Sequence, residues 1–196
     1  MQGCNKRGTL KYYTGAMACG KSTHLLQKAF NYKSHGFDVI TLVSSLDDRF
    51  GVGKITSRIG ISSDARIISP NDKIIFEKIK EEVRASSKFG AILVDECQFL
   101  EAEAIDALAD IADELRIDVL CYGIKTDFNT NVFTGSLRLL EISDEIIDLP
   151  SICSCGANAI MNARLVSSIE KVLIGSEDAY KSMCRVCYKK FKKSKE

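Results

Sequence analysis

The feature that most constrains this chain is a short stretch near its start that matches the pattern G-x-x-x-x-G-K-[ST]. It consists of Gly15, Ala16, Met17, Ala18, Cys19, Gly20, Lys21 and Ser22. An apolar run over residues 10–14 precedes it and a helix-like run over residues 22–30 follows it, which is the context that a phosphate-binding loop requires. Glycines let the backbone turn tightly, and backbone N–H groups at the helix start attract negative charge. The sequence therefore predicts an α/β fold whose first strand ends in a phosphate site.

A second strand pattern predicts the metal that accompanies bound phosphates. Residues 91–94 are apolar and Asp95-Glu96 follows them. In a parallel sheet this carboxylate falls at the same edge as the phosphate loop. We expect Lys21 to reach the β- and γ-phosphates, and Ser22 and Asp95 to hold Mg²⁺. The alternative for Asp95 is a helix N-cap, and Glu96 can take a proton or position a nucleophile.

The order of patterns along the chain predicts alternating strands and helices up to residue 149. Strands are expected at about 8–14, 37–43, 65–68, 91–96, 118–123 and 145–149. Because a helix separates the first two strands, we expect them to pair in parallel. Residues 1–7 are expected to be disordered. Residues 44–64 lose periodicity and predict a mobile functional loop, not packed structure. The helix after Pro70 should bury one face, formed by Ile74, Ile75, Ile79 and Val83.

Cysteines mark a change of character after Pro150. Two close pairs, Cys153 with Cys155 and Cys184 with Cys187, are typical of a structural Zn²⁺ site of the zinc-ribbon type. Free reduced thiols are the alternative, and four thiolates leave no open position for metal catalysis. We expect a nucleotide-binding domain over residues 1–149 and a zinc-binding domain over 150–196. The basic run 189–195 is expected to be a solvated, mobile end, with nucleic-acid binding as the alternative.

Composition narrows the classes of function. The chain has 196 residues and a formal net charge of +1, so it has no whole-chain field for nucleic acid. It contains no apolar run long enough to span a membrane, and its first residues lack the apolar core of a secretion signal. These features predict a cytoplasmic protein, with no membrane and no nucleic acid among its partners.

Three classes of phosphate chemistry remain open at this point. Asp95-Glu96-Cys97-Gln98 fits the box of a helicase-like motor, but a chain of this length holds one nucleotide-binding core. A regulatory ATPase is a second class. A small-molecule kinase is the third, with Glu96 accepting the hydroxyl proton and the cysteine-held segment closing over the acceptor. Phe128 and Phe133 in the polar loop 125–133 either stack on a base or anchor that loop to the core.

Six short motifs together carry a resemblance. They are Gly15-x-Met17-x-x-Gly20-Lys21-Ser22-Thr23, Asp95-Glu96-x-Gln98-Phe99, Tyr122-Gly123-x-Lys125-x-Asp127-Phe128, Phe133-x-Gly135-Ser136, Ile152-Cys153-x-Cys155-Gly156-x-x-Ala159, and Ile174-Gly175-x-Glu177 leading through Tyr180 to Cys184-Arg185-x-Cys187-Tyr188. Their order and spacing over nearly the whole chain resemble the zinc-containing cytosolic type of thymidine kinase.

The resemblance implies ATP-dependent phosphorylation of the 5′-hydroxyl of thymidine or deoxyuridine on a P-loop (RecA-like) parallel sheet, with a small C-terminal zinc-ribbon-like lasso domain. It implies that residues 15–22, Asp95 and Gln98 bind ATP, that Ser22 and Asp95 serve Mg²⁺, and that Glu96 and Arg49 are catalytic, with Asp47 paired to Arg49. It implies a base pocket made of Met17, Phe99, Phe128, Phe133, Lys171, Val172, Leu173, Ile174, Gly175 and Tyr180. Family members are typically homotetramers inhibited by dTTP.

Two residues depart from the family pattern. Lys125 stands where bacterial relatives are expected to carry Arg, which removes a bidentate contact. Ser176 replaces the usual second glycine of the lasso, so that its turn can differ. Neither departure touches the phosphate loop or Glu96.

Overall fold

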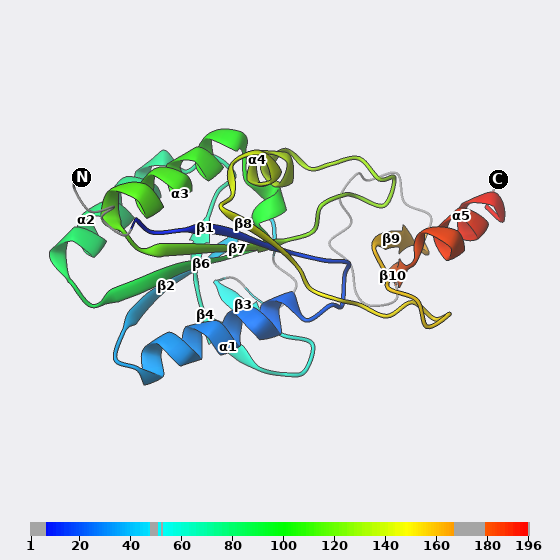
Figure 1. The fold of residues 1–196 in the computed structure, drawn as a ribbon, viewed down its shortest axis with the longest axis horizontal. Coiled ribbons are helices and arrows are strands. Elements are labelled where there is room, and N and C mark those ends of the chain that lie inside the picture. The colour runs from blue at the N-terminus through cyan, green and yellow to red at the C-terminus, as the bar shows by residue number, and fades with distance from the viewer. Residues whose placement is uncertain (1–6, 48–50, 52, 167–178, 196) are drawn as a thin grey trace, which may run out of the picture.

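The structure is a computed structural model that describes residues 7–47, 51, 53–166 and 179–195. Its centre is a sheet of six parallel strands (Figure 1) in the order β5-β2-β6-β7-β1-β8. The strands are β1 (Leu10–Thr14), β2 (Asp38–Ser44), β5 (Arg66–Ile68), β6 (Phe89–Asp95), β7 (Asp118–Gly123) and β8 (Glu145–Asp148). Because all run the same way, their carboxyl ends share one edge, where sites of such sheets form.

The predicted pairing of the first two strands is wrong. Both edges of β1 are occupied, by β7 on one side and β8 on the other. β2 instead pairs with β5 and β6. A helical crossover therefore makes β1 and β2 parallel without making them neighbours, since β6 and β7 are inserted between them.

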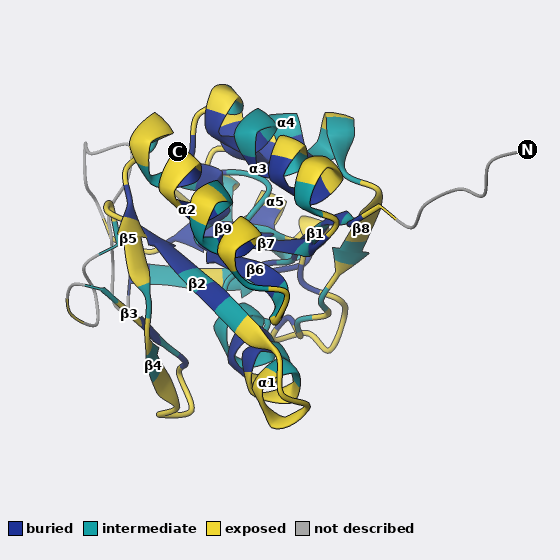
Figure 2. Cartoon of the chain, turned by 90° about the vertical axis from the view of Figure 1, so that its left-hand side faces the viewer, coloured by how far each residue is buried: buried dark blue, intermediate teal, exposed yellow. Residues whose placement is uncertain are grey.

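Helices cover both faces of this sheet. α1 (Lys21–Ser34) lies on one face, and α2 (Lys73–Ala85), α3 (Ala102–Leu115) and α4 (Thr134–Ile142) lie on the other (Figure 1). Alternate residues of each strand supply the two apolar cores, so Ile92 packs toward α2 and α3 while Leu93 packs toward α1. Figure 2 shows the buried central strands between these exposed helix surfaces.

The helix after Pro70 forms as predicted, but its buried face is partly different. The Asp72 carboxylate accepts a hydrogen bond from the Ile75 N–H at 3.1 Å and caps the helix start. Ile79 and Val83 are buried as expected, whereas Ile74 is 70 % exposed and Phe76 takes its place in the core. Phe76, Ile79 and Val83 recur at spacings of three and four, which is one face of a helix.

The expectation that residues 44–64 lack packed structure is also wrong. β3 (Lys54–Thr56) and β4 (Ser62–Asp64) form an antiparallel hairpin within this stretch. Ile55 is 1 % exposed and packs with Leu25 and Val43 in the core beneath α1. The strands of three residues are too short to show a periodic pattern, so the sequence hides them.

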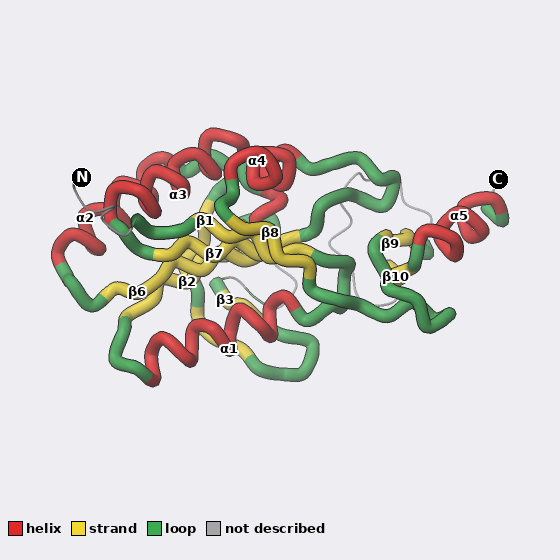
Figure 3. The backbone as a smooth tube through the Cα atoms, in the orientation of Figure 1, coloured by secondary structure: helices red, strands yellow, loops and turns green. Residues whose placement is uncertain are grey.

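The C-terminal part builds a small unit at one end of the sheet (Figure 3). It contains the antiparallel pair β9 (Met161–Arg164) and β10 (Tyr180–Met183), followed by α5 (Arg185–Lys193). The basic run predicted to be a mobile end therefore forms most of α5, because Tyr188 and Phe191 share one face and pack inward while Lys189, Lys190 and Lys193 are exposed. The domain division at residue 150 stays a prediction.

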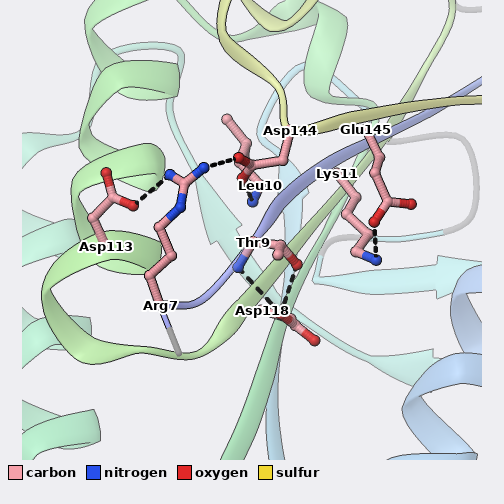
Figure 4. A network of polar contacts seen from close by, with 8 residues as sticks. All are labelled: Arg7, Thr9, Leu10, Lys11, Asp113, Asp118, Asp144 and Glu145. Carbon is pink, nitrogen blue, oxygen red and sulfur yellow. Dashed lines mark hydrogen bonds and ion pairs between the residues drawn. The ribbon is translucent and has the colours of Figure 1, made fainter. Parts of the chain in front are cut away.

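Polar contacts fasten the start of β1, the end away from the phosphate loop (Figure 4). Arg7 forms ion pairs with Asp113 and Asp144. Asp118 accepts from the Thr9 hydroxyl at 2.7 Å, and Asp144 also accepts from the Leu10 N–H at 2.8 Å. Arg7 is thus held in place, while the rest of the segment predicted to be disordered lies outside the described residues. None of the described helices is long and apolar enough to cross a membrane.

The hairpin correction gives a test of stability. Ile55→Ala should lower the free energy of unfolding by about 2–4 kcal/mol, because it removes buried methylene groups and leaves a cavity. Ile59→Ala, in the turn of the same hairpin, where Ile59 is 69 % exposed, should change it by less than about 0.5 kcal/mol. Denaturant unfolding of both variants makes the comparison, and equal small effects would show that the hairpin does not pack as described.

Candidate active site

The phosphate loop joins β1 to α1 and is shaped by close backbone contacts. At Gly15, φ is 154°, and an added Cβ would lie 2.5 Å from the Leu149 carbonyl oxygen, so only glycine fits. The Lys21 ammonium lies inside the loop and donates to the carbonyls of Gly15 at 3.2 Å and Ala16 at 2.9 Å. The loop thus presents a cation and the free N-terminus of α1 on the same side of the sheet edge, which suits a polyphosphate.

The C-terminal strands hold the peptide groups on either side of the Met17 Cα. The Met17 N–H donates to Asn162 Oδ1 at 2.8 Å, and its carbonyl accepts from the Ser182 hydroxyl. Asn162 lies on β9 and Ser182 on β10, so both strands of the ribbon dock on the phosphate loop. The Asn162 side chain is largely buried there, at 6 % exposure for the residue.

Two adjacent acids follow β6 at this edge. Asp95 is 4 % exposed, and both its burial and the charge of Glu96 raise the pKa of its carboxyl group, which a hydrogen bond from Ser22 opposes. Glu96, not Asp95, caps the short 3-10 helix Cys97–Phe99, so the predicted alternative for Asp95 has no support in the helix start. Two carboxyl groups beside a hydroxyl offer the oxygen ligands that Mg²⁺ takes.

Gln98 orients Glu96. Its side-chain amide donates to Glu96 Oε2, and its Oε1 accepts from the Ile124 N–H at 3.2 Å. The close approach depends on Gly123, where an added Cβ would lie 2.5 Å from Gln98 Oε1. Gln98 is therefore placed to set the direction of the Glu96 carboxylate, and its predicted contact with ATP stays a prediction.

A single cavity of about 210 Å³ brings most predicted site residues together. Its wall includes the phosphate-side residues Ala18, Gly20, Lys21, Ser22, Asp47, Asp95, Glu96 and Gln98. The same wall includes the predicted base-pocket residues Met17, Phe99, Phe128, Phe133 and Tyr180. Gly15, Ala16 and Cys19 belong to the loop but do not line this cavity.

The aromatic side of the cavity is ordered by contacts between side chains. The rings of Phe99 and Phe133 meet edge to face, with centroids 5.9 Å apart and an interplanar angle of 83°. Phe128 lies under the guanidinium of Arg164, whose Cζ is 3.8 Å from the ring centre. Arg164 also donates to the Tyr180 hydroxyl at 2.7 Å. Phe128 thus lines the cavity, as stacking on a base would require, and it is also packed against Arg164, as a residue that anchors its loop would be.

Sequence reasoning missed several residues of this wall. Asn162 and Arg58 line the cavity. Arg164 is 6 % exposed and contacts the wall residues Phe128 and Tyr180. Asn162 and Arg164 lie on the four-residue strand β9, and Arg58 lies in the turn between β3 and β4, so no periodicity marked them. The only available signal was the charge or amide of each side chain, and only Arg58 lay in a stretch predicted to be a loop.

Some predicted site residues lie outside the described residues and are not placed. They are Arg49, Lys171, Val172, Leu173, Ile174 and Gly175, together with Ser176, which departs from the family pattern. Lys125, the other departure, is described. Its ammonium pairs with Asp148 Oδ1 at 2.7 Å, at the carboxyl end of β8.

The four predicted zinc ligands converge. The sulfur atoms of Cys153, Cys155, Cys184 and Cys187 all lie within 4.8 Å of one another. The sulfurs of Cys155 and Cys184 are 3.6 Å apart, too far for a disulfide. A tetrahedral zinc site with Zn–S distances of about 2.3 Å has sulfur–sulfur edges of about 3.8 Å, so the cluster fits zinc. Cys97 and Cys121 are buried elsewhere, and burial raises the pKa of both thiols.

These features define a class of protein. The chain is a P-loop α/β protein with a RecA-like strand order, a polar and aromatic cavity at the phosphate loop, and a cysteine cluster that can hold a metal.

Comparison with known proteins gives the family. The thymidine kinase family model matches residues 8–188, and the chain belongs to the thymidine kinase family. A thymidine kinase of Shewanella oneidensis is 41 % identical over 188 residues, covering 93 % of this chain and 97 % of the relative. Thymidine kinases of Escherichia coli K12 and Vibrio parahaemolyticus are each 42 % identical, covering 92 % and 91 % of this chain and 90 % and 95 % of theirs.

The cysteine geometry predicts a metal content. The purified protein should contain about one zinc per chain, and Cys184→Ser should reduce this strongly because it removes one of four ligands. Cys19→Ser is the matched control, since Cys19 belongs to the phosphate loop and not to the cluster of four sulfurs, and it should keep its zinc. Elemental analysis by mass spectrometry measures both, and a metal-free wild-type protein would refute the zinc site.

Proposed function

We propose that this protein transfers the γ-phosphoryl group of ATP to the 5′-hydroxyl of thymidine or deoxyuridine. The observation that supports this most is the shared cavity, in which a phosphate loop and an aromatic pocket face the same two acids. A hydrolase needs room for water beside the phosphates, whereas a kinase needs an organic acceptor held there and water excluded. The names of the related proteins agree with a nucleoside acceptor.

Glu96 is the proposed proton acceptor. It follows Asp95, the last residue of β6. Its φ of 52° lies in the left-handed region, so the backbone turns away from the direction of the strand at Glu96. Gln98 donates to one of its carboxylate oxygens, and Glu96 lines the cavity in which the acceptor hydroxyl would lie. As that hydroxyl oxygen attacks the γ-phosphorus, its proton passes to Glu96 and the bond from phosphorus to the bridging oxygen of ADP breaks.

The phosphate side is proposed to bind and orient the donor. Lys21 would exchange its contacts with loop carbonyls for phosphate oxygens, because charged oxygens are stronger acceptors. Ser22 and Asp95 would hold Mg²⁺, which supplies neutralisation of phosphate charge when bound. Arg49 and Asp47 are proposed to act beside the phosphates.

The acceptor side is proposed to recognise the base. Met17, Phe99, Phe128, Phe133 and Tyr180 supply apolar and aromatic surface for a flat ring. Residues 171–175 are proposed to complete the pocket as a lasso. The same proposal includes a homotetrameric assembly, inhibition by dTTP and a cytoplasmic location. It includes neither nucleic acid nor a membrane as a partner.

The test is transfer of labelled phosphate from [γ-³²P]ATP to thymidine. The wild-type protein should form labelled thymidine monophosphate. Glu96→Gln should lower kcat by about 10²–10⁴ because it removes the proton acceptor and keeps the shape of the side chain. Glu101→Gln is the matched control, since Glu101 is exposed at the start of α3 and does not line the cavity, and its kcat should equal that of the wild type.

Two outcomes would contradict the proposal in different ways. Release of labelled inorganic phosphate without labelled nucleoside would favour a motor or regulatory ATPase. Full transfer activity in Glu96→Gln would leave the kinase but remove Glu96 as its proton acceptor.

A further inference from the structure

Phe128 is held in the cavity wall by α5, a helix that is itself outside the cavity. The Phe128 carbonyl accepts a hydrogen bond from the Tyr188 hydroxyl. The Lys192 ammonium donates to Asn129 Oδ1 at 2.8 Å and lies 5.8 Å from the centre of the Phe128 ring. Tyr188 and Lys192 are four residues apart, so one face of α5 holds two consecutive residues of the loop.

The loop that carries Phe128 has its own internal structure but needs an outside anchor. The buried Asp127 carboxylate accepts from the backbone N–H groups of Asn129 at 2.8 Å and Asn131 at 2.9 Å. These bonds fix the turn, as Asp side chains commonly do. They do not fix the turn relative to the ribbon β9–β10, where Arg164 and Tyr180 lie. Arg164 contacts the Phe128 ring, and the contacts from α5 hold the backbone of Phe128 and the side chain of Asn129.

The start of α5 coincides with the cysteine cluster. Cys184 is the N-cap residue, and its sulfur accepts from the Cys187 N–H at 3.5 Å. Tyr188 follows Cys187 directly and is 7 % exposed. A metal bound to these sulfurs would therefore fix the helix end from which Tyr188 reaches the loop.

We propose that Tyr188 and Lys192 are positioning residues for the nucleoside, acting through Phe128. Tyr188 holds the Phe128 backbone, Lys192 holds the next residue, and Arg164 covers the ring face, so that the ring stands in one place for the base to stack on. α5 is then the connection between the cysteine cluster and the nucleoside pocket. Neither Tyr188 nor Lys192 is among the described residues that line the cavity. The inference rests on the proposed kinase function.

The consequence is specific to one substrate. A displaced Phe128 weakens binding of the nucleoside, whereas the phosphate loop and Glu96 stay as they are. Tyr188→Phe removes one hydroxyl and keeps the ring in its packed site. It should raise the KM for thymidine about five-fold, the size of one lost hydrogen bond, while kcat and the KM for ATP stay within about two-fold.

Lys192→Ala should give a smaller effect in the same direction, about two-fold in the KM for thymidine, because its contacts are partly exposed to solvent. Lys193→Ala is the matched control, since Lys193 is the neighbouring lysine on the exposed face of α5, and it should match the wild type. Zinc content and the midpoint of denaturant unfolding, measured on each variant, show that the fold is retained.

The experiment is steady-state kinetics of these variants with thymidine and ATP varied in turn. A rise confined to the KM for thymidine supports the inference. An unchanged KM for thymidine in a folded Tyr188→Phe protein overturns the inference while the kinase function stands. A fall in kcat with both KM values unchanged does the same. A wild-type protein that cannot phosphorylate thymidine overturns both. If Tyr188→Phe does not fold, the comparison of Lys192→Ala with Lys193→Ala decides.

Discussion

Two hydrogen bonds to the main chain at Met17 connect the two halves of the site. The Met17 N–H bonds to Asn162 and its carbonyl bonds to Ser182, so the phosphate loop is bound by both strands of the β9–β10 pair. A two-stranded ribbon is marginally stable alone, and docking on the loop gives it a fixed place. Ala16 joins the C-terminal apolar cluster with 3 % exposure, which adds packing to the same contact. The conformation of the phosphate loop and the position of the β9–β10 ribbon, which carries part of the aromatic side of the cavity, therefore depend on each other.

The electrostatics of the cavity follow from this arrangement. Asp95 is held at the end of a buried strand beside Glu96, where burial and the charge of Glu96 both raise the pKa of the Asp95 carboxyl group. The loop holds Lys21 near Asp95, where its ammonium donates to the backbone carbonyls of Gly15 and Ala16. Such a site is arranged for a cation and a polyphosphate together, and an acceptor on the aromatic side would complete it.

The sequence predicted the parts of the molecule that follow strong local rules. The phosphate loop, the strand before Asp95, the helix after Pro70 and the cysteine cluster were all placed correctly, because tight turns, periodic segments and ligand spacing are local signals.

The failures come from long-range structure. The neighbours of β1 depend on which strands fill its two edges, which no local pattern encodes. The three-residue strands β3 and β4 have no detectable period, and Asn162 and Arg164 gain their roles from strand pairing far along the chain. α5 packs through Tyr188 and Phe191 and bonds to the loop at Phe128, which lies far away along the chain, so its lysines alone suggested a solvated tail.

The central claim is that donor phosphate and acceptor hydroxyl meet in one cavity and react directly. The stereochemistry of transfer tests it most directly, with ATP made chiral at the γ-phosphorus by oxygen isotopes and sulfur. A single in-line attack in a shared cavity predicts inversion of configuration in the thymidine monophosphate analogue that forms. Retention would require two successive displacements through a phosphorylated side chain, and it would contradict the account.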